Sequence, residues 1–188
     1  MKLDSRKMIT SSIVFGFFLI PIHEFGHVIC DWITGHPAAM SYARDYLLNG
    51  NEKPFLGILG GPLLPIILSI VSVILIYKRK NISLFYPIAV LGTLDRLLLY
   101  VFGQLPSDER DLASMAGWNI YSFKYIFLSA EVILLLLILF SLIKYKVSIK
   151  QSVFVFIIPI VCFIIGALIG IFVVERFVFP GQFKIQFG

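Results

Sequence analysis

Five long apolar stretches occupy most of the sequence and leave little chain for an aqueous domain. They cover residues 8–33, 61–77, 84–103, 121–143 and 151–174. A helix needs about 20 mainly apolar residues to cross the hydrocarbon core of a bilayer, and each stretch is close to that length. Because 59% of the residues are hydrophobic and only 14% are charged, the composition excludes an ordinary water-soluble domain. We therefore predict an all-α membrane protein, a polytopic bundle of about five transmembrane helices.

The chain is short enough to form one domain. We expect a single integral membrane domain over residues 1–188, with a core at 1–118 that holds the first three spans and two additional spans at 119–188. Cys30 and Cys162 lie far apart in apolar stretches, so neither a disulfide framework nor a cysteine-based metal site is expected. The net charge of +5 comes from short clusters between apolar runs, which argues against a nucleic-acid partner.

The basic residues predict an orientation in the bilayer, because cytoplasmic flanks carry the excess of Lys and Arg. Three clusters would then face the cytoplasm: one before the first span, one between the second and third, and one between the fourth and fifth. The N-terminus is expected in the cytoplasm and the C-terminus outside it. No small-residue cleavage site closes the first stretch, so we expect a retained span rather than a signal peptide. The clusters consist of Lys2, Arg6, Lys7, Lys78, Arg79, Lys80, Lys144, Lys146 and Lys150.

Residues 34–60 are too long for a tight turn and too apolar for a solvent loop. Short extended runs flank Asn49-Gly50, a pair that favours a hairpin turn. Open strand edges are tolerated at membrane depth only where protein or a watery cavity covers them. We therefore predict a membrane-associated β-hairpin between the first two spans, packed against the helices.

The most informative residues are His23, Glu24 and His27, which stand inside the first apolar stretch as His-Glu-Phe-Gly-His. Ionisable groups at the bilayer centre cost roughly 2.5–3.5 kcal/mol each on insertion scales, so they are functional candidates. On a helix, His23 and His27 project from one face and can bind a single zinc, with Glu24 beside the open coordination position as general base. By chance such a pattern is expected only about 0.001 times in this composition.

A catalytic zinc needs a third protein ligand, and the segment after the third span supplies Asp108 and Asp111. Gly103 and Pro106 should end that span, and Ser107 could cap a new short helix. The third span runs in the same direction as the first, so it delivers the carboxylates to the side where His23 and His27 lie. His36 is expected to be a loop or interfacial residue.

The remaining acidic residues receive no catalytic role from the sequence. Glu109 is expected to stabilise a helix N-terminus. Asp95 could support the site from behind or serve a structural purpose, and its neighbour Arg96 should point to a different face. Glu131 and Glu175 are expected to face a cavity or an interface.

These residues resemble the site-2 protease family of intramembrane zinc metalloproteases. His-Glu-Phe-Gly-His at 23–27 matches the metal motif of the family, Gly60-Gly61-Pro62-Leu63 is similar to the opening of its next span, and Pro106-Ser107-Asp108 resembles its Pro-Leu-Asp-Gly element. The resemblance covers residues 8 to about 118. It implies zinc bound by His23 and His27, Glu24 as catalytic base, and an aspartate after the third span as third ligand.

The family pattern leaves the third ligand open between Asp108 and Asp111, with the adjacent proline favouring Asp108. Glu109 replaces the glycine of the family, and Pro65 replaces an asparagine. The expected activity is zinc-dependent hydrolysis of peptide bonds in membrane-embedded or membrane-proximal proteins, with the hairpin edge holding an unwound substrate segment. The alternatives are a catalytically inactive zinc-binding or scaffold protein and a small ion transporter.

Overall fold

The computed structural model describes residues 3–49 and 52–178 and is mostly helical. Five helices are long and apolar enough to cross a membrane, in the order that the apolar stretches predict. They are α1 (Ser5–Ile33), α2 (Phe55–Tyr77), α3 (Ile82–Val101), α5 (Ser122–Lys144) and a last helix in which α6 (Ile149–Ile169), the π-helical turn η1 (Gly170–Glu175) and α7 (Arg176–Val178) follow one another.

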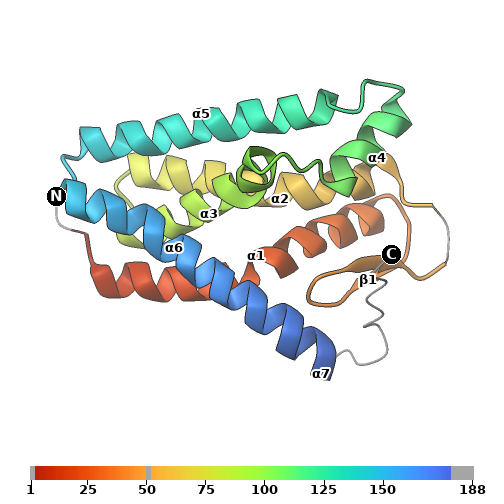
Figure 1. Cartoon of the computed structure of the whole chain (residues 1–188), viewed down its shortest axis with the longest axis horizontal. Coiled ribbons are helices and arrows are strands. Elements are labelled where there is room, and N and C mark those ends of the chain that lie inside the picture. The colour runs from red at the N-terminus through yellow and green to blue at the C-terminus, as the bar shows by residue number, and fades with distance from the viewer. Residues whose placement is uncertain (1–2, 50–51, 179–188) are drawn as a thin grey trace.

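Consecutive long helices run back and forth across the bundle (Figure 1). Helix α1 contacts α2, α3 and α6, while α5 covers α2 and α3 on the other side. The short helix α4 (Ser107–Ala116) packs on α2 and α5. Helix α1 therefore lies where three other helices can bring side chains to the histidine motif.

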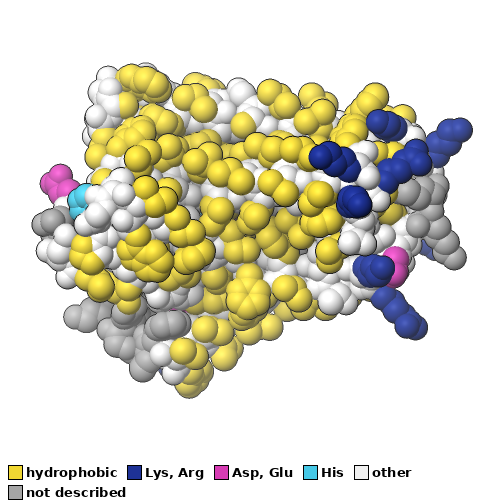
Figure 2. All heavy atoms as spheres, turned by 180° about the vertical axis from the view of Figure 1, so that it is seen from behind, with side chains coloured by type: hydrophobic (Ala, Val, Ile, Leu, Met, Phe, Trp, Pro, Cys, Tyr) yellow, Lys and Arg dark blue, Asp and Glu magenta, His cyan; other side chains and the backbone are white. Residues whose placement is uncertain are grey.

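Three short basic segments lie together at one end of the bundle: the start of α1, the α2–α3 loop and the α5–α6 loop (Figure 1). Figure 2 shows Lys and Arg side chains gathered at one end of the molecule, beyond a band of hydrophobic side chains. This separation is what the charge pattern requires of a multi-pass membrane protein. The side that faces the cytoplasm stays a prediction.

A small antiparallel sheet follows α1, but its turn is not the predicted one. Strand β1 (Ala38–Met40) pairs with β2 (Asp45–Leu47), so the turn lies between Met40 and Asp45. Asn49 comes after β2, and Gly50 lies outside the described residues. The prediction of a hairpin is confirmed, and the prediction of an Asn49-Gly50 turn is wrong.

The turn lies elsewhere because tertiary contacts hold it. Glu175 accepts hydrogen bonds from Ser41 Oγ (2.7 Å) and from the backbone amides of Tyr42 (3.0 Å) and Ala43 (3.3 Å). Glu175 is 2% exposed, so its carboxylate satisfies turn amides that would otherwise be buried without partners. This contact between residues far apart in the sequence therefore outweighs the local preference for a turn at Asn49-Gly50.

Tyr42 fixes the hairpin to α1 and α6. Its ring lies against Gly170, where a Cβ atom would collide with it. Its hydroxyl donates to the carbonyls of Phe17 (2.7 Å) and Gly166 (3.2 Å). The Phe17 carbonyl needs a donor because Pro21, four residues later, has no N–H. Burial raises the pKa of Tyr42 to about 12, so the hydroxyl remains protonated.

Helix α3 ends at Val101, and Gly103 follows with a φ of +75°, as the sequence predicts. Helix α4 then places Asp108 and Glu109 in its first turn. The predicted cap is wrong: Pro106 is the N-cap residue and Ser107 is the first helical residue. Proline fixes an extended entry into the helix without contributing a side-chain hydrogen bond.

Candidate metal centre

Glycines let α1 and α2 approach closely at the histidine motif. A Cβ atom on Gly26 would collide with the Gly60 carbonyl, and one on Gly60 would collide with the Gly26 carbonyl. One residue further, Gly61 faces the Nε2 atoms of His27 and His23. Because α2 carries no side chains at these positions, both imidazoles fit against its backbone.

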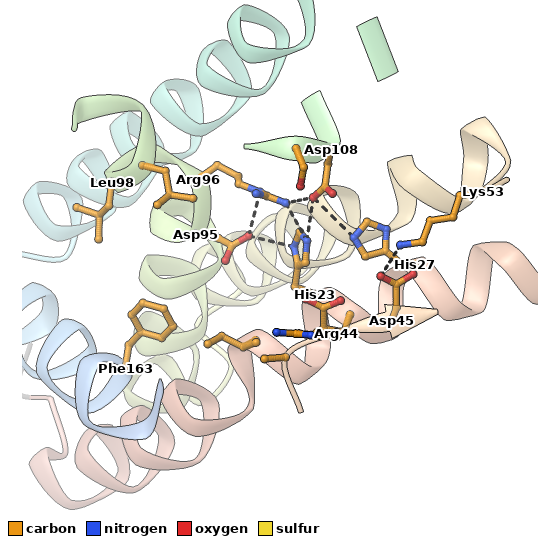
Figure 3. Close-up of a pocket in the computed structure, with 15 residues that line it drawn as sticks. His23, His27, Arg44, Asp45, Lys53, Asp95, Arg96, Leu98, Asp108 and Phe163 are labelled. Carbon is orange, nitrogen blue, oxygen red and sulfur yellow. Dashed lines mark hydrogen bonds and ion pairs between the residues drawn. The ribbon is translucent and has the colours of Figure 1, made fainter. Parts of the chain in front are cut away.

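The structure brings His23 and His27 together with Asp108 (Figure 3). Asp108 Oδ2 lies 3.1 Å from His23 Nε2 and 3.7 Å from His27 Nε2. Ligand atoms about 2.0–2.1 Å from a tetrahedral zinc are about 3.3 Å from one another. Asp108 Oδ2 thus lies at nearly this spacing from both nitrogens, and one ligand atom from each of the three residues lies within 4.8 Å of the others. This donor set suits a catalytic zinc with a fourth position open to water.

The two candidate third ligands are placed differently. Asp108 faces the imidazoles from the first turn of α4. Asp111 is exposed on the same helix and belongs to neither group of potential metal ligands found among the described residues. The geometry therefore favours Asp108.

Each imidazole also has an acceptor behind it. His27 Nδ1 lies 2.8 Å from the Gly57 carbonyl and must donate its proton there, so the lone pair of Nε2 faces the site. His23 Nδ1 lies 3.5 Å from Asp95 Oδ2, which is too long for a good hydrogen bond but close enough to orient the ring electrostatically. Asp95 thus lies on the far side of the His23 ring from Asp108, and the two roles that the sequence left open for it both stay predictions.

The sequence predicts that Arg96 points to a different face from its neighbour Asp95 and gives it no role in the site. Its Nη2 nevertheless lies 2.8 Å from His23 Nε2 and donates to Asp108 Oδ2 (Figure 3). Its long side chain reaches around α3, so the different direction of its Cβ does not keep it away. The cost of a charge in an apolar helix could have identified Arg96 by the argument that identified the histidines.

Two glutamates complete the buried polar region behind Arg96. Glu109 is fully buried and accepts a hydrogen bond from Tyr100 (2.6 Å), so it does more than stabilise an exposed helix end. Glu131 is also fully buried, with Oε1 3.3 Å from the backbone amide of Arg96. Glu131 therefore faces the interior of the bundle.

A cavity of about 490 Å³ opens in front of the histidines. Glu24 lines this cavity together with residues from the hairpin, α3, α4 and α6. The carboxylate of Glu24, a ring nitrogen of His27 and the carboxylate of Asp45 lie within 4.8 Å of one another. Glu24 is thus beside the imidazoles and next to a space that can admit water and a substrate.

Asp45 and Lys53 also line the cavity, although nothing in the sequence pattern marks either residue as part of a site. Lys53 Nζ lies 2.5 Å from Asp45 Oδ1, so this ion pair joins β2 to the segment before α2. No local pattern predicts the pair, since Asp45 reaches the site only because the hairpin folds back on α1. His36 lies in the loop after α1, as expected, with Nδ1 3.2 Å from Thr34 Oγ1.

The electrostatic environment keeps Asp108 ionised. Burial alone would raise the pKa of Asp108, but its close contacts with His23 and His27 and the charge of Arg96 hold it well below its usual range. An ionised carboxylate is the form that binds a metal. The site therefore presents one anionic and two imidazole donors on the same side of the cavity.

Comparisons with protein-family models, with curated proteins and with solved structures find no match to this chain. The resemblance to site-2 proteases accordingly depends on the short motifs quoted above.

Proposed function

We propose that this protein is an intramembrane zinc metalloprotease that hydrolyses peptide bonds of membrane-embedded or membrane-proximal proteins. The observation that carries the proposal is the convergence of His23 Nε2, His27 Nε2 and Asp108 Oδ2 beside a cavity lined by Glu24. These groups come from two helices far apart in the sequence. Ionisable groups are costly inside an apolar bundle, which makes such a cluster a functional candidate.

His23, His27 and Asp108 would hold the zinc. Bound there, zinc would polarise a peptide carbonyl and lower the pKa of a water molecule to about 7. Glu24 accepts the proton of the attacking water and returns it to the leaving amine. Asp95 and the Gly57 carbonyl keep the imidazole rings oriented during the reaction.

The substrate must present an extended segment, because the carbonyls of a helix are already hydrogen-bonded. The hairpin contributes the turn residues Ala43 and Arg44 and the first residue of β2, Asp45, to the cavity wall, so β2 begins beside the reacting groups. An unwound substrate segment can add to such an edge through main-chain hydrogen bonds. Selectivity for side-chain sequence should then be low.

The test is the cleavage of a tagged single-span membrane protein by the purified protein, with and without a chelator. Glu24→Gln should retain zinc and lower cleavage by about 10²–10⁴-fold, the usual contribution of a general base. Glu52→Gln makes the same chemical change in an exposed loop and should cleave normally. Undiminished cleavage by Glu24→Gln would refute the mechanism. Wild-type protein that binds zinc but cleaves nothing would favour the inactive zinc-binding alternative.

A further inference from the structure

Arg96 is the centre of an ionic cluster that joins α1, α3 and α4. Three carboxylates have an oxygen within 4.0 Å of its guanidinium: Asp95 (3.8 Å from Nε), Glu109 (3.7 Å from Nε) and Asp108, which accepts from Nη2. The same Nη2 reaches His23. Arg96 is 7% exposed, so these interactions are largely protected from solvent, where ionic contacts are strongest.

The position of Asp108 needs such a partner. Asp108 and Glu109 are adjacent like charges in the first turn of a helix that only residues 102–106 connect to α3. Both carboxylates turn inward, toward Asp95, a third negative charge. Mutual repulsion would drive them apart unless a buried cation lay between them. The guanidinium supplies that charge, and the fixed geometry of its N–H donors also determines how the carboxylate of Asp108 is oriented.

Tyr100 holds the other side of the cluster. It lies four residues after Arg96, on the same face of α3, and its hydroxyl donates to Glu109. Arg96 and Tyr100 together therefore fix the rotation of α4 about its axis. In this rotation Asp108 faces the histidines and Asp111 is exposed.

We propose that Arg96 is a positioning residue of the metal centre: it holds Asp108 against the two histidines and thereby makes Asp108, rather than Asp111, the third ligand. The inference rests on the proposed zinc site and adds the residue that assembles it. Arg96 has this role through Asp108, so removal of Arg96 should matter only while Asp108 is present.

The experiment measures zinc affinity by chelator competition for the purified protein and a set of variants. Arg96→Gln should weaken zinc binding by about 10–100-fold, the usual effect of losing a residue that orients a ligand. Arg110→Gln removes the same charge from an exposed position two residues beyond Asp108 and should bind zinc normally. Arg96→Lys keeps the positive charge but loses the planar guanidinium, so its zinc affinity should lie between those of the wild type and Arg96→Gln.

A double-mutant cycle separates positioning from a general structural effect. In an Asp108→Ala background, Arg96→Gln should cause no further loss of zinc affinity. With cobalt in place of zinc, the visible spectrum of Arg96→Gln should approach that of Asp108→Ala, because both lose the same ligand. Should Arg96→Gln not fold, Arg96→Lys applies the same test in both backgrounds.

Three results would overturn the inference: zinc affinity in Arg96→Gln that equals or exceeds that of the wild type, wild-type affinity in Arg96→Lys, or an equal loss with and without Asp108. Each of these leaves the zinc site itself in place. A wild-type protein that binds no divalent metal would instead refute the proposed function, so the two failures are distinguishable.

Discussion

Gly61 is the residue at which packing and chemistry are most closely coupled. It lets α2 pass in front of the imidazoles, and a methyl group at this position would collide with the Nε2 atoms of both histidines. Close packing leaves little room for such a group to be accommodated by small shifts. Gly61 thus leaves room for the imidazole nitrogens and lets the two helices pack closely.

Gly61→Ala should therefore lower zinc affinity by at least about tenfold, or about 1.4 kcal/mol, because the new methyl group occupies the space in front of the ligand nitrogens. Leu63→Ala, at an exposed position on the same helix, should bind zinc as the wild type does. Chelator competition measures both. Equal zinc affinity in Gly61→Ala and the wild type would show that the metal lies elsewhere.

The residues of the site differ in how far the sequence could predict them. His23 and His27 follow from helical spacing alone, because four residues bring two side chains to one face. The sequence limits the third ligand to Asp108 or Asp111 but does not decide between them, because the choice depends on the rotation of α4. In the structure, Arg96 and Tyr100 contact that helix. Arg96 was missed because the direction of its Cβ was taken as the direction of its charged group, which lies several bonds further away.

The hairpin and the last helix form a unit that local sequence does not indicate. Pro21 leaves a carbonyl of α1 without its helical partner, and the Tyr42 hydroxyl supplies the donor. Glu175 holds the turn from the other side. The short extended runs in the sequence correctly predict a hairpin. The position of its turn depends on contacts with residues more than 120 positions away, and local sequence preferences contain no information about such contacts.

Tyr42→Phe should destabilise this unit by about 1 kcal/mol, because the half-buried Phe17 carbonyl loses its donor. Amide hydrogen exchange of residues 38–47 should become faster, while exchange in α5 should not change. Tyr125→Phe, which removes a hydroxyl from a largely exposed side chain, is the matched control. Unchanged protection of the hairpin in Tyr42→Phe would mean that its hydroxyl does not anchor the strands.

The five long helices were predictable because length and apolar composition determine them directly. Their arrangement was not, since the sequence does not state which helices pack together. In the structure, the first three helices and α4 surround the candidate site, while α5 buries Glu131 behind it and α6 holds the hairpin beside it. The two additional helices thus support the site from opposite sides.

Orientation in the membrane is a property of the whole molecule. With the basic end in the cytoplasm, a fluorescent protein fused to the N-terminus should fold, and alkaline phosphatase fused to the C-terminus should be active outside. Neutralising Lys78, Arg79 and Lys80 together should weaken the preference for this orientation in the membrane. Phosphatase activity from an N-terminal fusion, and none from a C-terminal one, would reverse the predicted topology.

The central claim is that His23, His27 and Asp108 hold a zinc ion, and metal stoichiometry tests it most directly. Elemental analysis of the purified wild type should find about one zinc per chain, and Asp111→Ala should retain it. His27→Ala and Asp108→Ala should each retain markedly less zinc than the wild type while remaining folded by circular dichroism. Zinc absent from the wild type, or retained in full by Asp108→Ala, would contradict the account.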